Sequence, residues 1–311
     1  MEKVKVSIVI PSYNEEGNIG ELYAQLKNEL SKTSYPDHEI IFVDDGSTDG
    51  SWDVIIALSQ KDAKLRGFRF SRNFGHQNAL KAGLDLSRGD AVISMDGDLQ
   101  HPPEMIHTFL EEWKNGHQIV QALHKGTEDA GPFKELTSRL YYFILNSISD
   151  FDIVPGASDF RLLDRAVVDE IKQMNESHLF IRSIISWIGF NKKYIEYRAS
   201  KRFSGKTKYS IWRMMRFALD GVVSFSIKPL RIAIVFGCLI SLLAFVYIVY
   251  ALVAHFILEI TLPGWTSLLI SVLFIGGIQL ICTGILGEYL GRHFIESKNR
   301  KSYIISDRVG E

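Results

Sequence analysis

The stretch VSIVIPSYNEE, residues 6–16, decides the fold of this 311-residue chain. Its first five residues lack polar alternation, which is typical of a strand covered on both faces within a mainly parallel sheet. Polar residues follow directly, at the carboxyl end of the predicted strand. Because ligands of such sheets bind beyond the carboxyl ends of the strands, residues 11–16 are the first candidates for a functional site.

Similar apolar runs recur downstream and alternate with helical patterns. Further strands are predicted at residues 39–43, 67–70 and 91–95, and helices at about 17–30, after Gly50 and at about 76–86. This alternation is typical of βαβ units. The sequence therefore predicts an α/β fold with a mainly parallel sheet and helices on both faces.

Composition limits the classes of function. The chain is 46% hydrophobic and 23% charged, which is enough to bury a sizeable core. The net charge of −1 conceals −8 over residues 1–195 and +7 over residues 196–231, and this asymmetry predicts an anionic partner for the basic part. The two cysteines, Cys238 and Cys282, lie in apolar runs and fit neither a disulfide framework nor a zinc site.

Phosphate-binding glycine motifs are missing from the sequence. The first strand is not followed by Gly-x-Gly-x-x-Gly, and there is no Walker A motif. The chain therefore lacks the phosphate-binding motifs that are usual in dinucleotide-dependent oxidoreductases and in P-loop phosphotransferases. A nucleotide could still bind with its diphosphate neutralised by a metal ion.

Asp96 and Asp98 are the candidate metal ligands. They end a mostly apolar strand, and two carboxylates one residue apart can turn toward one cation. An oxygen-only set suits Mg²⁺ or Mn²⁺, with water and substrate phosphate completing the coordination. The alternative is a solvated turn or helix cap before Pro102 and Pro103.

Four motifs together carry a resemblance to a known family. They are residues 6–16, VDDGSTDG at 43–50, SRNFG at 71–75 and MDGDLQHPPE at 95–104. In this order they resemble glycosyltransferase family 2, and most closely its polyprenyl-phosphate branch, which includes dolichol-phosphate mannose synthase and the bactoprenol glucosyltransferases. The resemblance extends over essentially the whole chain and implies a fold of the glycosyltransferase A type.

The resemblance also implies roles for individual residues. A nucleotide-sugar donor would lie against Pro11, Tyr13 and Glu15, with Asp44 or Asp45 at the nucleobase and ribose. Asp96, Asp98 and Gln100 would hold the diphosphate and its metal ion. The alternative for Asp44 and Asp45 is ordinary turn chemistry before a helix, and His101 would either support the metal ligands or be a bystander.

Asp159 and Arg161 are predicted to act on the acceptor side. They share a face if their segment is extended, and by resemblance Asp159 corresponds to the family's proposed catalytic base. A lipid phosphate is largely dianionic at pH 7, so orientation of the acceptor is the better role for Asp159; a structural salt bridge with Arg161 is the alternative.

Arg202 and Lys206 belong to a basic loop, residues 202–210, that resembles the family's loop over the diphosphate. Arginine and lysine there could stabilise the leaving nucleoside diphosphate or bind the acceptor phosphate. A solvated loop and attraction to anionic membrane lipids are the alternatives.

Two segments near the C-terminus are predicted to span a membrane. Residues 232–258 and 261–287 contain no Asp, Glu, Lys or Arg, and each exceeds the length of about 20 apolar residues that crosses a bilayer. Basic residues flank the pair on both outer sides, which places both termini and the catalytic part in the cytoplasm. The N-terminal apolar run is too short for a signal peptide, and a pair of buried core helices is the alternative for the two spans.

The sequence divides into four predicted regions. Residues 1–200 form a cytosolic catalytic domain, 201–231 the basic loop with a juxtamembrane amphipathic helix, 232–287 the transmembrane hairpin and 288–311 a cytosolic basic tail. Amphipathic stripes at 211–222 and 140–148 predict helices lying on the membrane, with packing against the soluble core as the alternative.

The predicted reaction is single, inverting transfer of a sugar from a nucleotide sugar to a polyprenyl phosphate at the inner membrane. UDP-glucose and undecaprenyl phosphate are the expected pair, with UDP-GlcNAc, an aminoarabinose donor or GDP-mannose as alternatives. The product would pass to a flippase and a glycan transferase for envelope modification. Anionic lipids and a second copy of the chain are further candidate partners, and nucleic acid is not one. A processive polysaccharide synthase and a non-catalytic scaffold are the rival functions.

Overall fold

The structure is a computed structural model that describes residues 5–124, 154, 156–174, 181–197, 228–257 and 264–310. These residues fall into two compact units, an α/β unit that includes residues 299–310 and a helical unit that contains α9 (Lys228–Phe256) and α10 (Trp265–Ser297). Arg202, Lys206 and the amphipathic stripes predicted at 140–148 and 211–222 lie outside the described residues.

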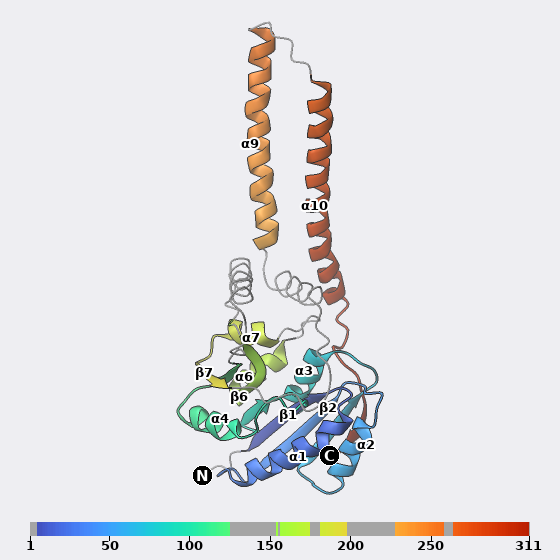
Figure 1. The fold of residues 1–311 in the computed structure, drawn as a ribbon, viewed down its shortest axis with the longest axis vertical. Helices are drawn as coiled ribbons and strands as arrows, with labels where there is room; N and C mark the ends of the chain where they lie inside the picture. Colours follow the sequence, from blue (N-terminus) through green and yellow to red (C-terminus); the bar gives the residue numbers. More distant parts are fainter. Residues whose placement is uncertain are drawn as a thin grey trace, which may run out of the picture. The chain divides into compact units, whose positions relative to one another are not determined.

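The α/β unit alternates strands and helices from its first element (Figure 1). Its first half comprises β1 (Val6–Ser12), α1 (Glu16–Ser31), β2 (His38–Asp44), α2 (Ser51–Ser59), β3 (Leu65–Phe70), α3 (His76–Leu86) and β4 (Ala91–Ser94). It continues with α4 (Met105–Lys114), β5 (Ile119–His124), β6 (Ala157–Asp164), α6 (Arg165–Gln173), α7 (Ile181–Ile188), β7 (Lys192–Tyr197) and β8 (Ile305–Val309). The strands and helices predicted up to residue 95 are confirmed within a few residues.

The strands form one mostly parallel sheet in the order β7-β5-β6-β4-β1-β2-β3-β8. β1, β2, β3 and β4 run parallel, as do β5 and β7, whereas β6 is antiparallel to β4 and β5. Because β6 runs opposite to β4, its first residues lie at the carboxyl end of β4. The topology thus brings Asp159 to the edge of the sheet where Asp96 and Asp98 emerge.

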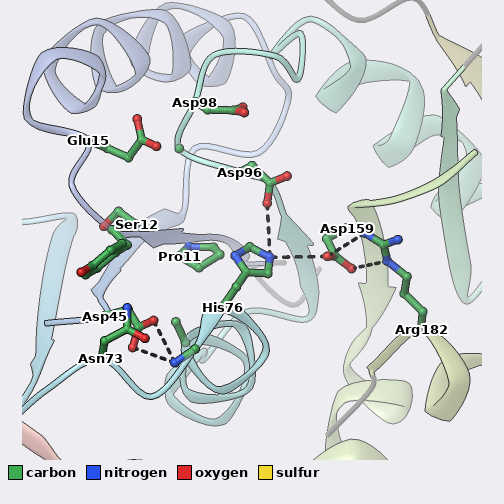
Figure 2. A pocket seen from close by; sticks show the side chains of 14 residues that line it. Pro11, Ser12, Glu15, Asp45, Asn73, His76, Asp96, Asp98, Asp159 and Arg182 are labelled. Carbon is green, nitrogen blue, oxygen red and sulfur yellow. Dashed lines mark hydrogen bonds and ion pairs between the residues drawn. The ribbon is translucent and has the colours of Figure 1, made fainter. Parts of the chain in front are cut away.

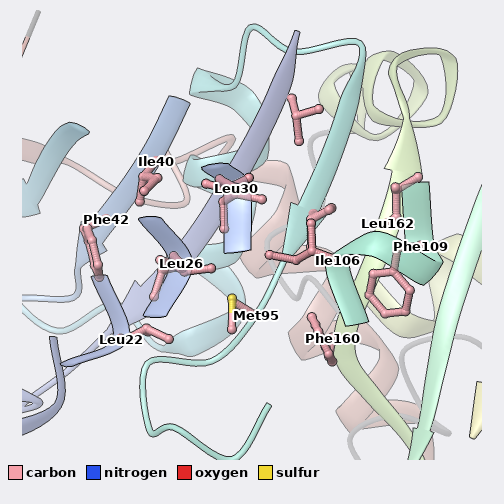
Figure 3. Packing of buried hydrophobic residues seen from close by; sticks show 14 of the residues in the cluster. Leu22, Leu26, Leu30, Ile40, Phe42, Met95, Ile106, Phe109, Phe160 and Leu162 are labelled. Carbon is pink, nitrogen blue, oxygen red and sulfur yellow. The ribbon is translucent and has the colours of Figure 1, made fainter. Parts of the chain in front are cut away.

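Alternate residues of β1 face opposite helix layers, as the two-residue period of a strand requires. Ile8 and Ile10 belong to the large apolar core that α1 and α4 cover with Leu22, Leu26 and Phe109 (Figure 3). On the other face α3 packs closely, because a Cβ added at Gly83 would lie 2.1 Å from Val9 Cγ1. The fully buried strands therefore match the sequence-based prediction of helices on both faces.

The last strand comes from the end of the chain. β8 follows α10 and pairs antiparallel with β3, with Phe68 opposite Arg308. The sequence predicts no strand there, and residues 288–311 are expected as a basic tail. The structure instead continues α10 to Ser297 and uses residues 305–309 as an edge strand of the sheet.

The helical unit contains two long helices, α9 (Lys228–Phe256) and α10 (Trp265–Ser297). Among the described residues, one segment is long and apolar enough to cross a membrane, Phe274–Ser297 in α10. α9 contributes a shorter apolar segment, Ala233–Tyr247, which at 1.5 Å per residue extends only about 22 Å. Two spans are predicted from the sequence, and the described residues give one.

Candidate active site

A cavity of about 370 Å³ opens at the carboxyl ends of β1, β2 and β4 (Figure 2). Its described lining includes the carboxylates Glu15, Asp45, Asp96, Asp98 and Asp159, together with Pro11, Tyr13, Asn73, His76 and Arg182. Seven of the twelve residues predicted for the site thus contribute to one cavity: Pro11, Tyr13, Glu15, Asp45, Asp96, Asp98 and Asp159. The site lies where a parallel sheet is expected to bind its ligand.

Asp45 fixes the loop that joins β3 to α3. Its carboxylate accepts hydrogen bonds from the backbone N–H groups of Phe74 (2.7 Å) and Gly75 (2.9 Å). Burial raises the pKa of Asp45, and these two N–H donors only partly oppose that effect. The aspartate therefore holds Asn73 and His76, which flank these donors in sequence, at the wall of the cavity.

Asp44 has a different position from its neighbour. Its side chain is fully buried, accepts hydrogen bonds from the backbone N–H and hydroxyl of Ser47, and lies 3.3 Å from Arg69 Nε. It does not line the cavity. Of the two residues that the sequence left open for nucleotide binding, Asp45 faces the site and Asp44 makes the turn contacts.

Gly46 allows the Asp45 turn to pack against the β3–α3 loop. Its φ of +70° is in the left-handed region, and an added Cβ would lie 2.5 Å from the carbonyl carbon of Arg72. Gly46→Ala should therefore lower the free energy of unfolding by about 1–3 kcal/mol, measured as a drop in the thermal midpoint of the purified protein. Gly20→Ala is the control, since its added Cβ meets nothing within 4 Å and the residue is inside α1. Equal midpoints for both variants would contradict the assignment.

Asp96 and Asp98 point into the cavity from the loop after β4 (Figure 2). The Oδ1 atom of Asp96 is buried and accepts no hydrogen bond from the described residues. Asp98 Oδ1 accepts the backbone N–H of Gln100 at 3.2 Å, whereas Gln100 itself does not line the cavity. Gln100, predicted as a metal residue, is thus placed beside Asp98 rather than at the cavity wall.

His101 supports the loop that carries Asp96. Its Nδ1 accepts the backbone N–H of Asp96 at 3.0 Å, and its ring stacks on Phe160 at 4.8 Å between centroids. Burial lowers the pKa of His101 despite the nearby aspartates, so the ring is neutral with its proton on Nε2. That nitrogen lies 3.7 Å from Asp96 Oδ2, which makes His101 a support for Asp96 rather than a bystander.

Asp159 is the centre of a charged cluster on the opposite wall. Arg182 donates to both of its oxygens at 3.0 Å, and His76 Nε2 lies 3.4 Å from Oδ2. The same nitrogen of His76 lies 3.5 Å from Asp96 Oδ1, so this histidine bridges the two walls (Figure 2). The pKa of His76 is raised, because Asp159 and Asp96 outweigh the effect of burial.

The ionisation of Asp159 follows from these partners. Burial alone would raise its pKa, but Arg182, His76 and Arg161 together hold the pKa well below its usual range. A carboxylate this acidic is a poor proton acceptor near neutral pH. The electrostatics therefore favour a role in orientation over a role as general base.

Arg161, predicted with Asp159 as a catalytic pair, is buried behind it. It donates to Asp159 and to the Ser158 carbonyl, and it does not line the cavity. Burial lowers its pKa to about 10, at which it stays charged. Arg161 thus forms the structural salt bridge with Asp159 that was the alternative to a catalytic role. Arg182 is the arginine that faces the cavity.

The lining also includes Asn73, His76 and Arg182, whose polar or charged side chains were not predicted for the site. Asn73 lies within a quoted motif and His76 follows it directly, so their place after the third strand was a usable signal. Arg182 is separated from Asp159 by 22 residues along the chain, and no local pattern pairs them. Its role is visible only once the chain has folded.

Two non-glycine residues beside the cavity have strained backbone. Asn14 (φ 56°) lies between Tyr13 and Glu15, and Leu99 (φ 61°) follows Asp98. The left-handed region costs about 1–2 kcal/mol for a residue such as Leu99 and less for asparagine, whose short side chain can form local hydrogen bonds. Asn14 is held by its side-chain contact with the Thr48 backbone N–H at 2.9 Å.

Asp96 and Asp98 suit a divalent cation that takes only one or two ligands from the protein. No group of three or more His, Cys, Asp or Glu suited to a metal occurs among the described residues, so a site made only of protein ligands is not found there. Mg²⁺ usually binds through one or two carboxylates and completes its shell with water and substrate phosphates. Asp96, whose buried Oδ1 accepts no hydrogen bond from the described residues, and Asp98 meet that requirement.

Comparison with known proteins gives two profile matches. Glycosyl transferase family 2 matches residues 7–172, and the GtrB C-terminal hairpin matches residues 228–293. The prophage bactoprenol glucosyl transferase homolog of Escherichia coli K12 is 40% identical over 97% of this chain and 98% of its own length. The bactoprenol glucosyl transferase of Shigella phage SfV is 39% identical over 98% and 99%.

Among solved structures, mannosyl-3-phosphoglycerate synthase from Rubrobacter xylanophilus is 16% identical, with a TM-score of 0.48. It covers 70% of this chain and 72% of its own.

Proposed function

The chain belongs to glycosyl transferase family 2, and from that membership we propose that it transfers one glucose residue from UDP-glucose to undecaprenyl phosphate. A phosphate oxygen of the lipid attacks the anomeric carbon, the bond from that carbon to the β-phosphate oxygen breaks, and UDP leaves. Attack from the face opposite UDP inverts the configuration. The names of the full-length relatives from E. coli and phage SfV support this acceptor and this sugar.

The cavity at the sheet edge is the single observation that carries the proposal. It sets Asp96 and Asp98 on one wall and Asp159 with Arg182 on the other, with His76 between them. A donor diphosphate and an acceptor phosphate need two such sites on either side of the reacting carbon. The arrangement supports direct transfer between two bound substrates.

On the donor side, Pro11, Tyr13 and Asp45 would contact the nucleoside. Tyr13 is 44% exposed at the cavity, so its ring is available for packing against the nucleoside. Asp96 and Asp98 would hold Mg²⁺ or Mn²⁺ together with the diphosphate. Such an ion neutralises the charge that develops on the leaving diphosphate.

On the acceptor side, Arg182 would bind the lipid phosphate. A carboxylate repels a phosphate dianion, so Asp159 would not contact it directly. By accepting two hydrogen bonds from Arg182, Asp159 orients the guanidinium, which remains 40% exposed beside the cavity. Asp159 is therefore assigned as a positioning residue and Arg182 as a phosphate-binding residue.

We assign the helical unit to the membrane as a two-helix hairpin. α9 and α10 expose large apolar side chains, including Phe236, Phe245, Leu280 and Phe294. Such exposure is costly in water and ordinary in lipid. Lys298, Arg300 and Lys301 follow α10, which supports a cytoplasmic α/β unit.

The reaction can be tested with the purified full-length chain in liposomes that contain undecaprenyl phosphate. Separate incubations with UDP-glucose, UDP-GlcNAc or GDP-mannose are followed by mass analysis of the lipid. We expect a product with one hexose from UDP-glucose, formed with Mg²⁺ or Mn²⁺ and lost with EDTA. A lipid bearing several sugars would indicate a polymerase, and release of UDP without any glycolipid would reject the acceptor.

A further inference from the structure

Tyr303 connects the end of the chain to the active-site loop. It follows α10 by six residues and precedes β8 by two. Its ring stacks on Phe70 of β3, with 5.1 Å between centroids and 13° between planes. Its hydroxyl donates to Asp85 of α3 at 3.0 Å.

The contact with Phe70 continues toward the cavity. Phe70 is buried and meets Phe74 edge-on, with 5.6 Å between ring centroids. The backbone N–H of Phe74 is one of the two that Asp45 accepts. A row of three aromatic rings thus leads from Tyr303 to the backbone that forms the cavity wall.

A backbone bond strengthens the same junction. The N–H of Ser71, the first residue after β3, donates to the carbonyl of Ile304 at 3.0 Å. The loop that carries Asn73 and His76 therefore begins at a residue bonded to the C-terminal segment. This bond does not depend on any side chain, so it persists when Tyr303 is substituted.

The contact with Asp85 fixes the other end of the loop. α3 begins at His76 and contains Asp85 in its last turn, where Lys81 also pairs with Asp85. A rigid helix transmits a shift at Asp85 to His76 at its start. Tyr303 thus contacts both β3 and α3, the two elements that residues 71–75 connect.

We propose that Tyr303 is a positioning residue of the donor pocket, holding β3 and α3 in the relation that places Asn73 and His76 at the cavity wall. Tyr303 does not line that cavity and would not touch the donor. The turnover part of this inference rests on the proposed function, whereas its structural part does not.

Tyr303 can be replaced without crowding its surroundings. Its ring borders a second cavity of about 620 Å³, formed with Lys81, Asp85 and residues 301–305. Tyr303→Phe keeps the stack on Phe70 and removes the hydroxyl, and Tyr303→Leu removes both the stack and the hydroxyl while retaining apolar volume. Tyr194→Leu is the matched control, because Tyr194 is on β7 at the opposite edge of the sheet.

Amide hydrogen exchange tests the structural part in the full-length protein. We expect Tyr303→Leu to increase exchange in a peptide covering residues 71–78 by about tenfold, with β1 unchanged, because the bonds from Phe74 and Gly75 to Asp45 open more often. Tyr303→Phe, which keeps the stack on Phe70 but loses the bond to Asp85, should give a smaller increase. Unchanged exchange in that peptide, or equal increases in β1, would overturn the inference.

Steady-state kinetics tests the effect on the site. Tyr303→Leu should lower kcat/KM for the donor by about tenfold, with part of the loss restored in Tyr303→Phe, since small displacements of positioning groups have effects of that size. The KM for the lipid should stay within about twofold in both. Donor kinetics like wild type would overturn the proposal. If the wild-type protein transferred no sugar, the proposed function would fail while the exchange experiment still decided the role of Tyr303.

Discussion

Replacing Asp96 by asparagine is expected to lower kcat/KM for sugar transfer by about 10³-fold while the protein still inserts into membranes. Its Oδ1 atom is buried at the cavity and accepts no hydrogen bond from the described residues, and its nearest charged neighbour there is His76 Nε2 at 3.5 Å. The amide keeps the shape of the side chain and removes the charge that a divalent cation needs. The loss should therefore be in catalysis rather than in folding.

Asp98→Asn should resemble Asp96→Asn, and both should require more Mg²⁺ or Mn²⁺ for half-maximal rate. Asp169→Asn is the control, because Asp169 is 53% exposed on α6 and does not line the cavity. Transfer of glucose at the wild-type rate by both active-site variants would reject the metal assignment. UDP affinity, measured by calorimetry with and without Mn²⁺, should lose its metal dependence in both.

Asp159→Asn is expected to have the second largest effect, a fall of about 10²-fold in kcat/KM for the lipid. The amide cannot accept two charge-assisted hydrogen bonds from Arg182, so the guanidinium loses its orientation. The loss should appear mainly as a higher KM for undecaprenyl phosphate. A loss confined to kcat, with lipid KM unchanged, would favour the role of general base.

The pH dependence separates the same two roles. Because partners hold the pKa of Asp159 well below 3.8, its carboxylate stays ionised at all neutral and mildly acidic pH values. Its contribution to stability is therefore complete above about pH 4 and is lost as pH falls toward the folded-state pKa. Asp159 itself does not titrate from pH 5 to 8, but it raises the pKa of His76, and the stability that this gives is lost as pH rises through that pKa. The stability difference between wild type and Asp159→Asn should therefore be larger at pH 5 than at pH 8, and no acid limb in the rate should belong to Asp159.

Asp159→Asn leaves the buried Arg161 without a full counter-charge and could cost about 3–5 kcal/mol of stability. Arg182→Ala is the second variant, since it leaves Asp159 with Arg161 and His76. It should raise the KM for the lipid with a smaller change in the thermal midpoint. An unchanged KM for the lipid in Arg182→Ala would remove Arg182 from the acceptor site.

The sequence was most informative where function and local structure depend on short segments. The strands of β1, β2 and β4 are uninterrupted apolar runs, and the polar residues after them lie at one edge because parallel strands share a direction. Pro11, Glu15, Asp45, Asp96 and Asp98 could thus be predicted as neighbours from order alone. His76 could have been added by the same argument.

Site residues that are brought together only by contacts between distant parts of the chain could not be predicted in this way. β6 enters the sheet antiparallel beside β4, and only that topology puts Asp159 opposite Asp96. Arg161 and Arg182 are both plausible partners of Asp159 by charge, and burial decides which one faces the cavity. β8 was missed because ISDRV, residues 305–309, is a short polar strand without an apolar pattern.

The pairing of β8 with β3 has a consequence for synthesis of the chain. Since a ribosome releases residues in order, β3 has an unpaired edge throughout translation of α9 and α10. An open edge can pair with other nascent chains. A premature stop codon shortly after residue 298 would leave that edge permanently uncovered, and aggregation of such a product is expected even though every predicted ligand-binding residue has been translated.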